Sequence, residues 1–456
     1  VYISYDNDDA GKKWATKLAN KIKVRFPHIS VMNITLPSDK GKDITEYFLH
    51  GGKPEDLTST YCESALGVKP WDLPPMYTQE IIDVLSETIK HDDVNKVLVF
   101  LAFLSAYTDE SQINILLNAP SSSGKTFIPL EIARYFPEES IMKLQYVSRT
   151  AFFHENGEYN SETNENHIDL SRKIIIFIDQ PWSDLLEKLR PLLSHDDKVL
   201  KSKITDKNAK GGTKTQVVVL HWFPVVIYCT ASPWLDEQEA TRFLLLSPET
   251  TQNKLQASIG SRILYETNKQ EAKEKIAGNK SIATLKDRLT LIRDARIDDV
   301  VIEDASLIND IFFKDKQDLQ PRDQRDVTRV LSIIKAFTLL NFADRRREGN
   351  RLFATQRDIE EGVALWKEIW PWQQHGVSPY IIDIYKSVFL PAFIEHNRLN
   401  TDKPFTPSPL IGIKRGDVCK KHYQVKGRIL SETKWRQDIE PALENAWLIH
   451  KEMDGR

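Results

Sequence analysis

The segment from Ala119 to Thr126, with the sequence APSSSGKT, contains the residue types from which a chain can build a phosphate site. It fits the phosphate-loop pattern G-x-x-x-x-G-K-[ST], with Ala in place of the first Gly. Small residues let backbone N–H groups surround phosphate oxygens, while Lys125 supplies a cation and Thr126 a hydroxyl for Mg²⁺. We therefore predict that ATP and Mg²⁺ bind at Ala119, Pro120, Ser121, Ser122, Ser123, Gly124, Lys125 and Thr126. The alternative is an ordinary Ser/Gly turn.

A carboxylate follows the apolar run of residues 172–181, RKIIIFIDQP. The run predicts a buried strand that ends in Asp179, whose side chain could hold the same Mg²⁺ through its water shell, beside Thr126. The next residue, Gln180, can orient a water molecule but cannot accept its proton. We predict catalytic roles for Lys125, Asp179 and Gln180. Capping of the following helix is the alternative role for Asp179.

Three more side chains are candidates for contact with a γ-phosphate. The run PVVIYCTASP predicts a strand that ends in Thr230 and Ser232 at the carboxyl edge of a sheet, and Ser232 is the sensor candidate. Arg242, in EATRFLLLSPE, opens the next apolar strand and could point toward a neighbouring subunit's nucleotide, where arginine stabilises transition-state charge. Among the arginines of RDQRDVTRV, Arg325 is the preferred candidate for reaching the same phosphates. A surface salt bridge is the alternative for Arg242.

The segment of residues 198–214 carries six lysines and one acid, Asp206, and contains the turn sequence NAKGG before the apolar run TQVVVLHW. This pattern predicts a β-hairpin with a basic tip. Lysines act as point charges in sequence-independent contacts with phosphates. The candidates for DNA contact are Lys203, Lys207, Lys210 and Lys214. A solvated hairpin without a ligand is the alternative.

Two carboxylates, Asp6 and Asp8, directly follow the run VYISY at the start of the chain. Because they leave the predicted sheet edge together, they suit an oxygen-ligated Mg²⁺, which Asp43 in GKDITEYF could join. An acidic turn that caps a helix is the alternative.

The elements that must position these residues alternate between strands and helices. Val1–Tyr5 and Ile29–Ile34 are predicted strands on either side of a helix over Ala10–Phe26, and a helical region covers Tyr77–Tyr107. The strands predicted after it are Ile113–Leu117, Lys173–Ile178, Val217–Leu220 and Val225–Cys229. Such alternation is typical of a parallel α/β sheet.

The rest of the sequence predicts a linker and helices. Lys53–Pro75 is rich in proline and turn residues, as in a linker. Gln252–Trp372 lacks convincing strands and shows helical periodicity, most clearly in DVTRVLSIIKAFTLLNF. Gly412–Arg456 contains two short helices and the apolar segment AWLIHKEMDGR, which is similar to the opening strand of a wing.

Composition limits the class of protein. The chain has 456 residues, a length for which about three domains are expected. It is 41% hydrophobic and 28% charged, which excludes collagen-like and wholly disordered proteins. The formal charge of -3 gives no overall basic signature, so a nucleic-acid surface must be local.

Cysteine usage and hydropathy bear on the compartment. Three scattered cysteines without a C-x-x-C pair indicate a reducing compartment, and we expect the cytoplasm. The longest apolar stretch, Val97–Ala106, is shorter than the roughly 20 residues of a membrane-spanning helix, so no membrane association is expected.

Residues 1–57 resemble the second half of a Toprim domain, found in bacterial-type primases, topoisomerases and some nucleases. The resemblance assigns the D-x-D motif of that domain to Asp6 and Asp8, and its later acid to Asp43. The pattern also has a Glu on an earlier strand, which would precede Val1, and primer synthesis depends on it.

Residues from about Tyr77 to Trp372 are similar to AAA+ ring helicases of the superfamily 3 and minichromosome-maintenance type. The similarity assigns Walker A to Gly124, Lys125 and Thr126, Walker B to Asp179, the pre-sensor-1 hairpin to residues 198–214, sensor 1 to Ser232, the arginine finger to Arg242 and sensor 2 to Arg325. The sequence departs from the family at Gln180, where Walker B usually continues with Glu, and at Ser232, where sensor 1 usually has Asn.

The tail from Gly412 resembles the winged-helix domain that follows such motors, with Lys434 and Arg436 in a candidate recognition helix for DNA. The expected fold is thus α/β, with a partial Toprim unit over residues 1–57, a linker over 58–76, an AAA+ core over 77–250, an α-helical lid over 251–375, and a connector with a winged helix over 376–456.

This domain order resembles the primase-helicases of phages, plasmids and mobile elements. The resemblance implies a replicative DNA helicase: a homo-hexamer that hydrolyses ATP at its subunit interfaces to translocate on and unwind DNA. The expected partner is single-stranded or forked DNA. Two other functions stay open. One is a Toprim-ATPase nuclease of defence type that cleaves DNA at Asp6 and Asp8. The other is a scaffold ATPase that binds nucleotide without translocating.

Overall fold

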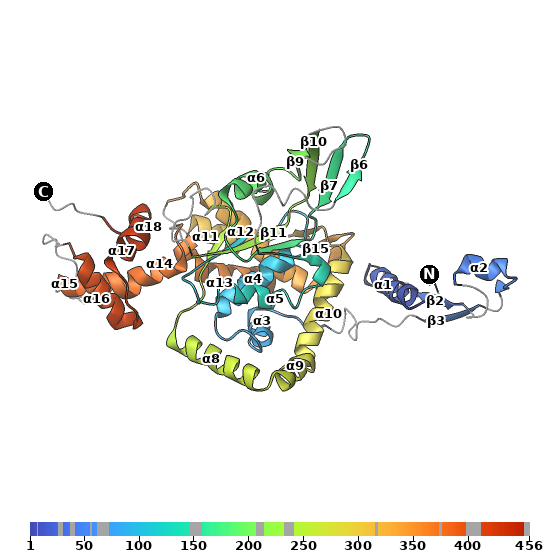
Figure 1. The fold of residues 1–456 in the computed structure, drawn as a ribbon, viewed down its shortest axis with the longest axis horizontal. Helices are drawn as coiled ribbons and strands as arrows, with labels where there is room; N and C mark the ends of the chain where they lie inside the picture. Colours follow the sequence, from blue (N-terminus) through green and yellow to red (C-terminus); the bar gives the residue numbers. More distant parts are fainter. Residues whose placement is uncertain are drawn as a thin grey trace.

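The structure is a computed structural model that describes residues 1–6, 8–25, 31–36, 42–54, 57–61, 73–145, 157–206, 214–231, 241–314, 318–373, 376–397 and 412–450 (Figure 1). It has a mixed α/β fold around a parallel sheet, which confirms the α/β class expected from the sequence. No helix within these described ranges is both long and apolar enough to cross a lipid bilayer.

Five parallel strands form the central sheet. Their order is β12 (Leu244–Leu246), β4 (Ile115–Asn118), β11 (Val225–Thr230), β8 (Ile174–Phe177) and β5 (Ile141–Leu144). Every residue of β4, β8 and β11 is buried, and their apolar, partly β-branched runs are typical of strands covered on both faces. Because the strands are parallel, their carboxyl ends meet at one edge, where ligands bind in open α/β sheets.

Alternate residues of the central strands pack into two apolar cores. Ile115 and Leu117 of β4 face the first core, whereas Leu116 between them faces the second, because successive side chains of a strand point to opposite faces. The helices that pack into the first core are α3 (Thr78–Leu85), α4 (Asp93–Ser105), α5 (Phe127–Ile132), α10 (Lys280–Ala295), α11 (Ser306–Phe313), α12 (Asp323–Leu340) and α13 (Gln356–Gln373). The second core lies against α6 (Ser183–Leu193).

The first core contains helices that precede the central sheet in the sequence and helices that follow it. Figure 1 shows α12, which follows the sheet along the chain, beside α4, which precedes it, and α13 packs against α12. The apolar stretch of residues 97–106 lies in this core, and α4 is apolar all round because it is buried there. By contrast, α8 (Gln252–Thr267) and α9 (Lys269–Ala277) run along the outside of the molecule, and α9 buries none of its residues.

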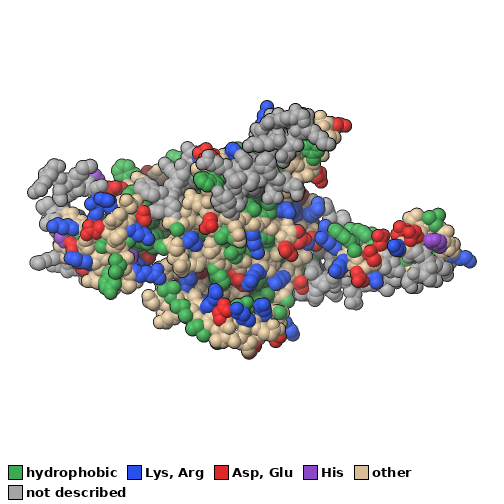
Figure 2. All heavy atoms as spheres, in the orientation of Figure 1, with side chains coloured by type: hydrophobic (Ala, Val, Ile, Leu, Met, Phe, Trp, Pro, Cys, Tyr) green, Lys and Arg blue, Asp and Glu red, His purple; other side chains and the backbone are tan. Residues whose placement is uncertain are grey.

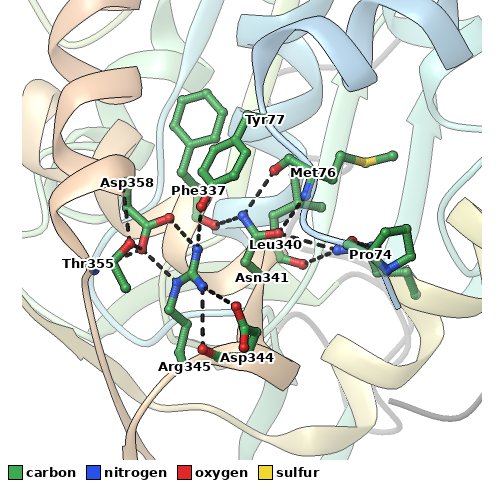
Figure 3. Close-up of polar contacts among 11 residues, drawn as sticks. Pro74, Met76, Tyr77, Phe337, Leu340, Asn341, Asp344, Arg345, Thr355 and Asp358 are labelled. Atoms are coloured by element: carbon green, nitrogen blue, oxygen red, sulfur yellow. Dashed lines mark hydrogen bonds and ion pairs between the residues drawn. The ribbon is translucent and has the colours of Figure 1, made fainter. Parts of the chain in front are cut away.

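Pro74, Met76 and Tyr77 lead into α3 and are fixed to the helical layer by polar contacts (Figure 3). Arg345 donates two hydrogen bonds of 2.8 Å to the two carboxylate oxygens of Asp358 and one of 2.9 Å to Tyr77 Oη. Asn341 and the backbone of Met76 exchange hydrogen bonds of 2.7 and 2.9 Å. The side chain of Asp358 is fully buried and that of Arg345 is 2% exposed, so the pair is part of the interior.

Three short strands lie in the region Gln252–Trp372, where the sequence shows no convincing strand. They are β13 (Asp299–Val301), β14 (Arg347–Glu348) and β15 (Arg351–Phe353), in the order β13-β15-β14. Strands of two or three residues are too short to show a period-2 pattern. The turn between β14 and β15 begins at Gly349, whose φ of 61° favours glycine.

A second sheet projects from the body of the molecule (Figure 1). Its order is β6 (Glu158–Asn160), β7 (Glu165–Asp169), β10 (Lys214–His221) and β9 (Val199–Asp206). Strands β9 and β10 pair antiparallel, from Lys214 with Asp206 to His221 with Val199, and form the two arms of the predicted hairpin. The neighbouring pair β6 and β7 was not predicted from the sequence, because its residues are mostly polar.

The first 61 residues form a small unit with β1 (Tyr2–Ile3), α1 (Asp9–Arg25), β2 (Met32–Thr35), α2 (Ile44–Leu49) and β3 (Thr58–Tyr61). Strands β1 and β2 are parallel on either side of α1 along the chain, as the predicted β-α-β order requires. Strand β3 pairs antiparallel with β2 and lies at residues that the sequence analysis placed in the linker.

The described part of the last region is helical. It contains α14 (Pro379–Ile384), a π-helical turn at Tyr385–Phe389, α15 (Leu390–His396), α16 (Arg415–Lys426), α17 (Glu432–Lys434), a second π-helical turn at Trp435–Ile439 and α18 (Glu440–Asn445). Their apolar side chains form a separate core, in which Phe389 stacks on Trp435 with 6.0 Å between ring centroids.

The wing strand expected from Ala446 does not begin within residues 446–450, and residues 451–456 lie outside the described part. Trp447 adopts φ 58°, and Leu448 N–H donates to Leu443 O at 3.0 Å. This is the left-handed closure with which many helices end. The apolar segment therefore starts as the cap of α18 and not as an extended strand.

Candidate functional site

Residues 119–126 form a loop between the carboxyl end of β4 and the first residue of α5, Phe127. Two of them have left-handed backbone conformations, Ser122 at φ 63° and Gly124 at φ 90°. Glycine adopts this conformation without steric cost, whereas serine does so uncommonly. Successive backbone N–H groups in such sharp turns form concave sites that attract anions.

Ser123 gives this loop an unsatisfied polar atom. Its Oγ is buried and has no hydrogen-bond partner among the described residues. A buried hydroxyl without a partner costs free energy, and a phosphate oxygen bound in the loop would supply one. The residues present therefore fit a phosphate group.

The ends of three neighbouring strands meet around Cys229 of β11. Its thiol donates a hydrogen bond to Lys125 O at 3.3 Å, and Lys125 Nζ donates to Pro120 O, also at 3.3 Å, so the side chain folds back over its own loop. Burial raises the pKa of Cys229 to about 12, with the charge of Lys125 lowering it and that of Asp179 raising it. Both charges therefore act on one buried thiol from opposite sides of β11, one following β4 and the other following β8.

Gln180 lies at the same edge of the sheet. Thr230, the last residue of β11, donates from Oγ1 to Gln180 Oε1 at 2.6 Å, and its carbonyl accepts from Ala119 N–H at 3.2 Å. The side chains of Asp179 and Gln180 are exposed. The structure thus brings Lys125, Asp179 and Gln180 together at the carboxyl edge of the sheet, whereas the predicted sensor, Ser232, lies outside the described residues.

Arg242 and Arg325 lie at the opposite edge of the same sheet. Arg242 precedes β12 and donates from Nε to Ser194 Oγ at 2.8 Å, and Arg325 donates to the hydroxyl of Thr241. Since strands rise about 3.3 Å per residue, this amino-terminal edge is about 15 Å from the 119–126 loop. An arginine side chain does not span that distance, so the structure does not bring these two residues to the loop of their own chain.

Burial and pairing distinguish the three arginines at the start of α12. Arg329 donates to Asp326 Oδ1 at 2.8 Å and to the carbonyls of Thr241 and Phe243 at 2.8 and 2.7 Å, and its burial lowers its pKa to about 10. Arg322 is also largely buried beside Asp326. Arg325 is exposed, so it is the member of the three that can reach another molecule.

The predicted metal carboxylates of the first unit serve partly as helix caps. Asp8 Oδ1 accepts from Gly11 N–H at 2.6 Å in the first turn of α1, and Asp43 Oδ1 accepts from Glu46 N–H at 2.8 Å at the start of α2. Asp6 is exposed. Within the described part of the chain, no three His, Cys, Asp or Glu side chains gather as metal ligands would, and the alternative of capping acids accounts for Asp8 and Asp43.

Two lysines of the outer strand β9, Lys201 and Lys203, are exposed. Lys201 pairs with Glu165 of β7 at 3.0 Å. Lys207 and Lys210 lie outside the described residues, and Lys214 is the first residue of β10. The other DNA candidates, Lys434 and Arg436, are exposed on either side of Trp435, which is 2% exposed in the last core.

Two residues behind the loop were missed by the sequence analysis. Lys254 of α8 and Asp92, the residue before α4, form a buried ion pair, and Lys254 Nζ also donates to Ser123 O at 3.4 Å. The phosphate-loop pattern ends at Thr126, and 131 positions separate Ser123 from Lys254, so no local spacing could have predicted the contact.

Comparison with known proteins adds no relative: no protein-family model matches the chain, and no curated protein matches it.

Proposed function

We propose that this protein is a subunit of an ATP-dependent DNA helicase, which hydrolyses ATP at the carboxyl edge of its central sheet. The observation that supports this most is the convergence of the 119–126 loop, Lys125 and Asp179 around Cys229. An anion-binding turn, a cation and a carboxylate at the ends of parallel strands are the groups that a nucleoside triphosphate with its metal requires.

In this proposal the backbone of the loop and Lys125 bind the phosphates, and Ser123 Oγ gains the partner that it lacks. Thr126 and Asp179 would hold Mg²⁺ through the hydroxyl and carboxylate oxygens that it prefers, and the metal would supply positive charge beside the phosphates. Gln180, held by Thr230, orients the attacking water. Because its amide cannot accept a proton, we expect slow hydrolysis that depends on charge stabilisation more than on a base.

The position of Arg242 and Arg325 favours an oligomer. Both lie at the edge opposite the loop, where Arg242 donates to Ser194 and Arg325 donates to Thr241. In a ring in which the amino-terminal edge of one subunit faces the loop of the next, these arginines would stabilise transition-state charge on the neighbour's phosphates. A homo-hexamer is the proposed assembly.

DNA contact is assigned to the projecting hairpin β9-β10 (Figure 1). Figure 2 shows Lys and Arg interspersed with Asp and Glu over the described surface of the face drawn, as the net charge of -3 suggests. Residues 198–214 contain six lysines and one acid, so the hairpin is a local exception to this mixed charge. Its lysines suit contacts with the phosphates of DNA.

Measurement of ATP hydrolysis with and without single-stranded DNA tests this proposal. The wild type should hydrolyse ATP faster with DNA than without it. Lys125→Ala should lose hydrolysis under both conditions. Lys143→Ala is a matched control, since Lys143 lies on the edge strand β5 of the same sheet. This variant should hydrolyse ATP at the wild-type rate. Absence of hydrolysis in the wild type would overturn the proposal. DNA cleavage without unwinding would favour the Toprim nuclease.

A further inference from the structure

Lys254 lies directly behind the phosphate loop, on the side away from solvent. Its side chain is 8% exposed and that of its partner Asp92 is 1% exposed. Its ammonium group meets three acceptors: the carboxylate of Asp92, Glu249 O at 2.9 Å and Ser123 O at 3.4 Å. A lysine has three N–H groups, so each has an acceptor.

Asp92 has an unusual, left-handed backbone conformation, which its contacts with Glu249 stabilise. It precedes α4 with φ 56°, and its side chain makes no cap bond to that helix. Its Oδ1 instead accepts from Glu249 N–H at 2.7 Å, while its own N–H donates to Glu249 Oε1 at 3.2 Å. A left-handed aspartate costs about 1–2 kcal/mol, so the surrounding contacts must stabilise this arrangement.

The start of α8 fixes Lys254 from the other side. Thr251 caps the helix by accepting from Lys254 N–H at 3.3 Å, so the residue sits in the first turn of the helix. A Cβ added to Gly124 would lie 3.9 Å from Lys254 Nζ, which shows how close the ammonium comes to the loop.

The contact with Ser123 O determines how one peptide of the loop is turned. In a trans peptide the C=O and N–H groups point in opposite directions. Because Lys254 holds the carbonyl of Ser123 toward the interior, the N–H of Gly124, in the same peptide, must point to the outer side of the loop. That is the side from which a phosphate would approach.

We propose that Lys254 is a positioning residue of the phosphate loop: it fastens the Ser123–Gly124 peptide so that its N–H is available to a bound phosphate. This inference rests on the proposed function, since it assumes that the loop binds a nucleotide. Asp92 balances the charge of the ammonium, whose two other acceptors are the backbone carbonyls of Glu249 and Ser123.

Titration calorimetry with Mg-ATP on the full chain tests the inference with three variants. Lys254→Met removes the donor and keeps the length of the side chain. Lys254→Met with Asp92→Asn also removes the carboxylate that would otherwise be left buried and unpaired, and asparagine tolerates the left-handed conformation. Asp92→Asn alone keeps the donor to Ser123. Lys273→Met, on the exposed helix α9, is the control.

Both variants without Lys254 should raise the Kd of Mg-ATP by about tenfold, as expected for one lost hydrogen bond from a charged donor. Asp92→Asn and Lys273→Met should bind as the wild type does. If the ion pair were merely structural, each single variant would bind Mg-ATP more weakly than the wild type. The double variant would then recover the lost affinity, because it leaves no unpaired buried charge. Urea unfolding without nucleotide measures the stability of each variant, and so separates a loss of stability from a loss of nucleotide affinity.

Three results are decisive. If the wild type binds Mg-ATP and the double variant binds it equally well, the role of Lys254 is wrong while the proposed function stands. If Asp92→Asn loses as much affinity as Lys254→Met, the ion pair and not the donor matters, and the inference is also wrong. If the wild type does not bind Mg-ATP, the proposed function fails and the inference fails with it.

Discussion

Lys125 and Gln180 are each hydrogen-bonded to a residue at the end of the neighbouring strand β11. These partners are Cys229 and Thr230, respectively. Such partners come from a strand over 100 residues later in the chain than Lys125, as the separation of 104 between Lys125 and Cys229 shows. A motif records the residues that touch a ligand, whereas the supporting contacts depend on which strands become neighbours.

His195 should make stability depend on pH. Its ring packs edge-on against Phe223, with 4.7 Å between centroids, and burial lowers its pKa from 6.5 to about 4. Between pH 6.5 and 4 the unfolded state therefore binds more protons than the folded state. Stability from this group is complete above pH 6.5 and falls by about 3 kcal/mol as the pH drops toward 4.

His195→Asn should reduce that loss, since asparagine does not titrate and tolerates the φ of 57° at this position. Urea unfolding of both proteins at pH 7.5 and pH 5 measures the difference. An equal loss of stability in wild type and variant would show that His195 is not the responsible group.

At the scale of elements, long and strongly apolar runs were predicted well and short ones were not. The buried strands β4, β8 and β11 each lie within or next to a predicted strand. Strand β5, at the sheet edge, was missed because its residues IMKL are partly exposed and carry no clear alternation. Strands β13, β14 and β15 have two or three residues each, and a pattern of period 2 needs more than that.

The Arg345–Asp358 pair should be a major contributor to the stability of the helical layer. Arg345→Met would leave Asp358 charged in a fully buried position, which typically costs about 3–5 kcal/mol. The matched control is the next residue. Arg346 pairs with Glu303 at 2.7 Å, but both side chains are more than half exposed, so Arg346→Met should cost about 1 kcal/mol or less.

Thermal and urea unfolding of the two variants provide the comparison. The melting temperature should fall clearly for Arg345→Met and little for Arg346→Met. Equal changes would mean that the buried contacts of Arg345, drawn in Figure 3, contribute no more stability than the exposed pair of Arg346.

In the whole molecule, the candidate site residues lie at both ends of the parallel strands of the central sheet. The loop, Lys125 and Asp179 lie at the carboxyl edge, and Arg242 lies at the amino edge. The sequence predicted that Arg242 would act on a neighbouring subunit, and this stays a prediction. The sequence could not predict that helices from both sides of the sheet share one core, because that depends on contacts such as α12 with α4.

Mixing two inactive variants tests action between subunits. Lys125→Ala lacks the loop cation and Arg242→Ala lacks the arginine, so neither should hydrolyse ATP alone. A mixed ring contains interfaces with an intact Lys125 from one subunit and an intact Arg242 from the next, so we expect part of the wild-type rate to return. A mixture as inactive as its components, with mixed rings demonstrated by native mass spectrometry, would contradict the assignment.

The most direct test of the central claim is strand displacement on a forked DNA duplex, with ATP and with a non-hydrolysable analogue. We predict that the wild type separates the strands with ATP and not with the analogue. Lys125→Ala should fail in both, and the double variant Lys207→Ala with Lys210→Ala should lose unwinding but still bind Mg-ATP. Unwinding that persists with the analogue or in Lys125→Ala, or a wild type that hydrolyses ATP without ever separating the strands, would contradict the account.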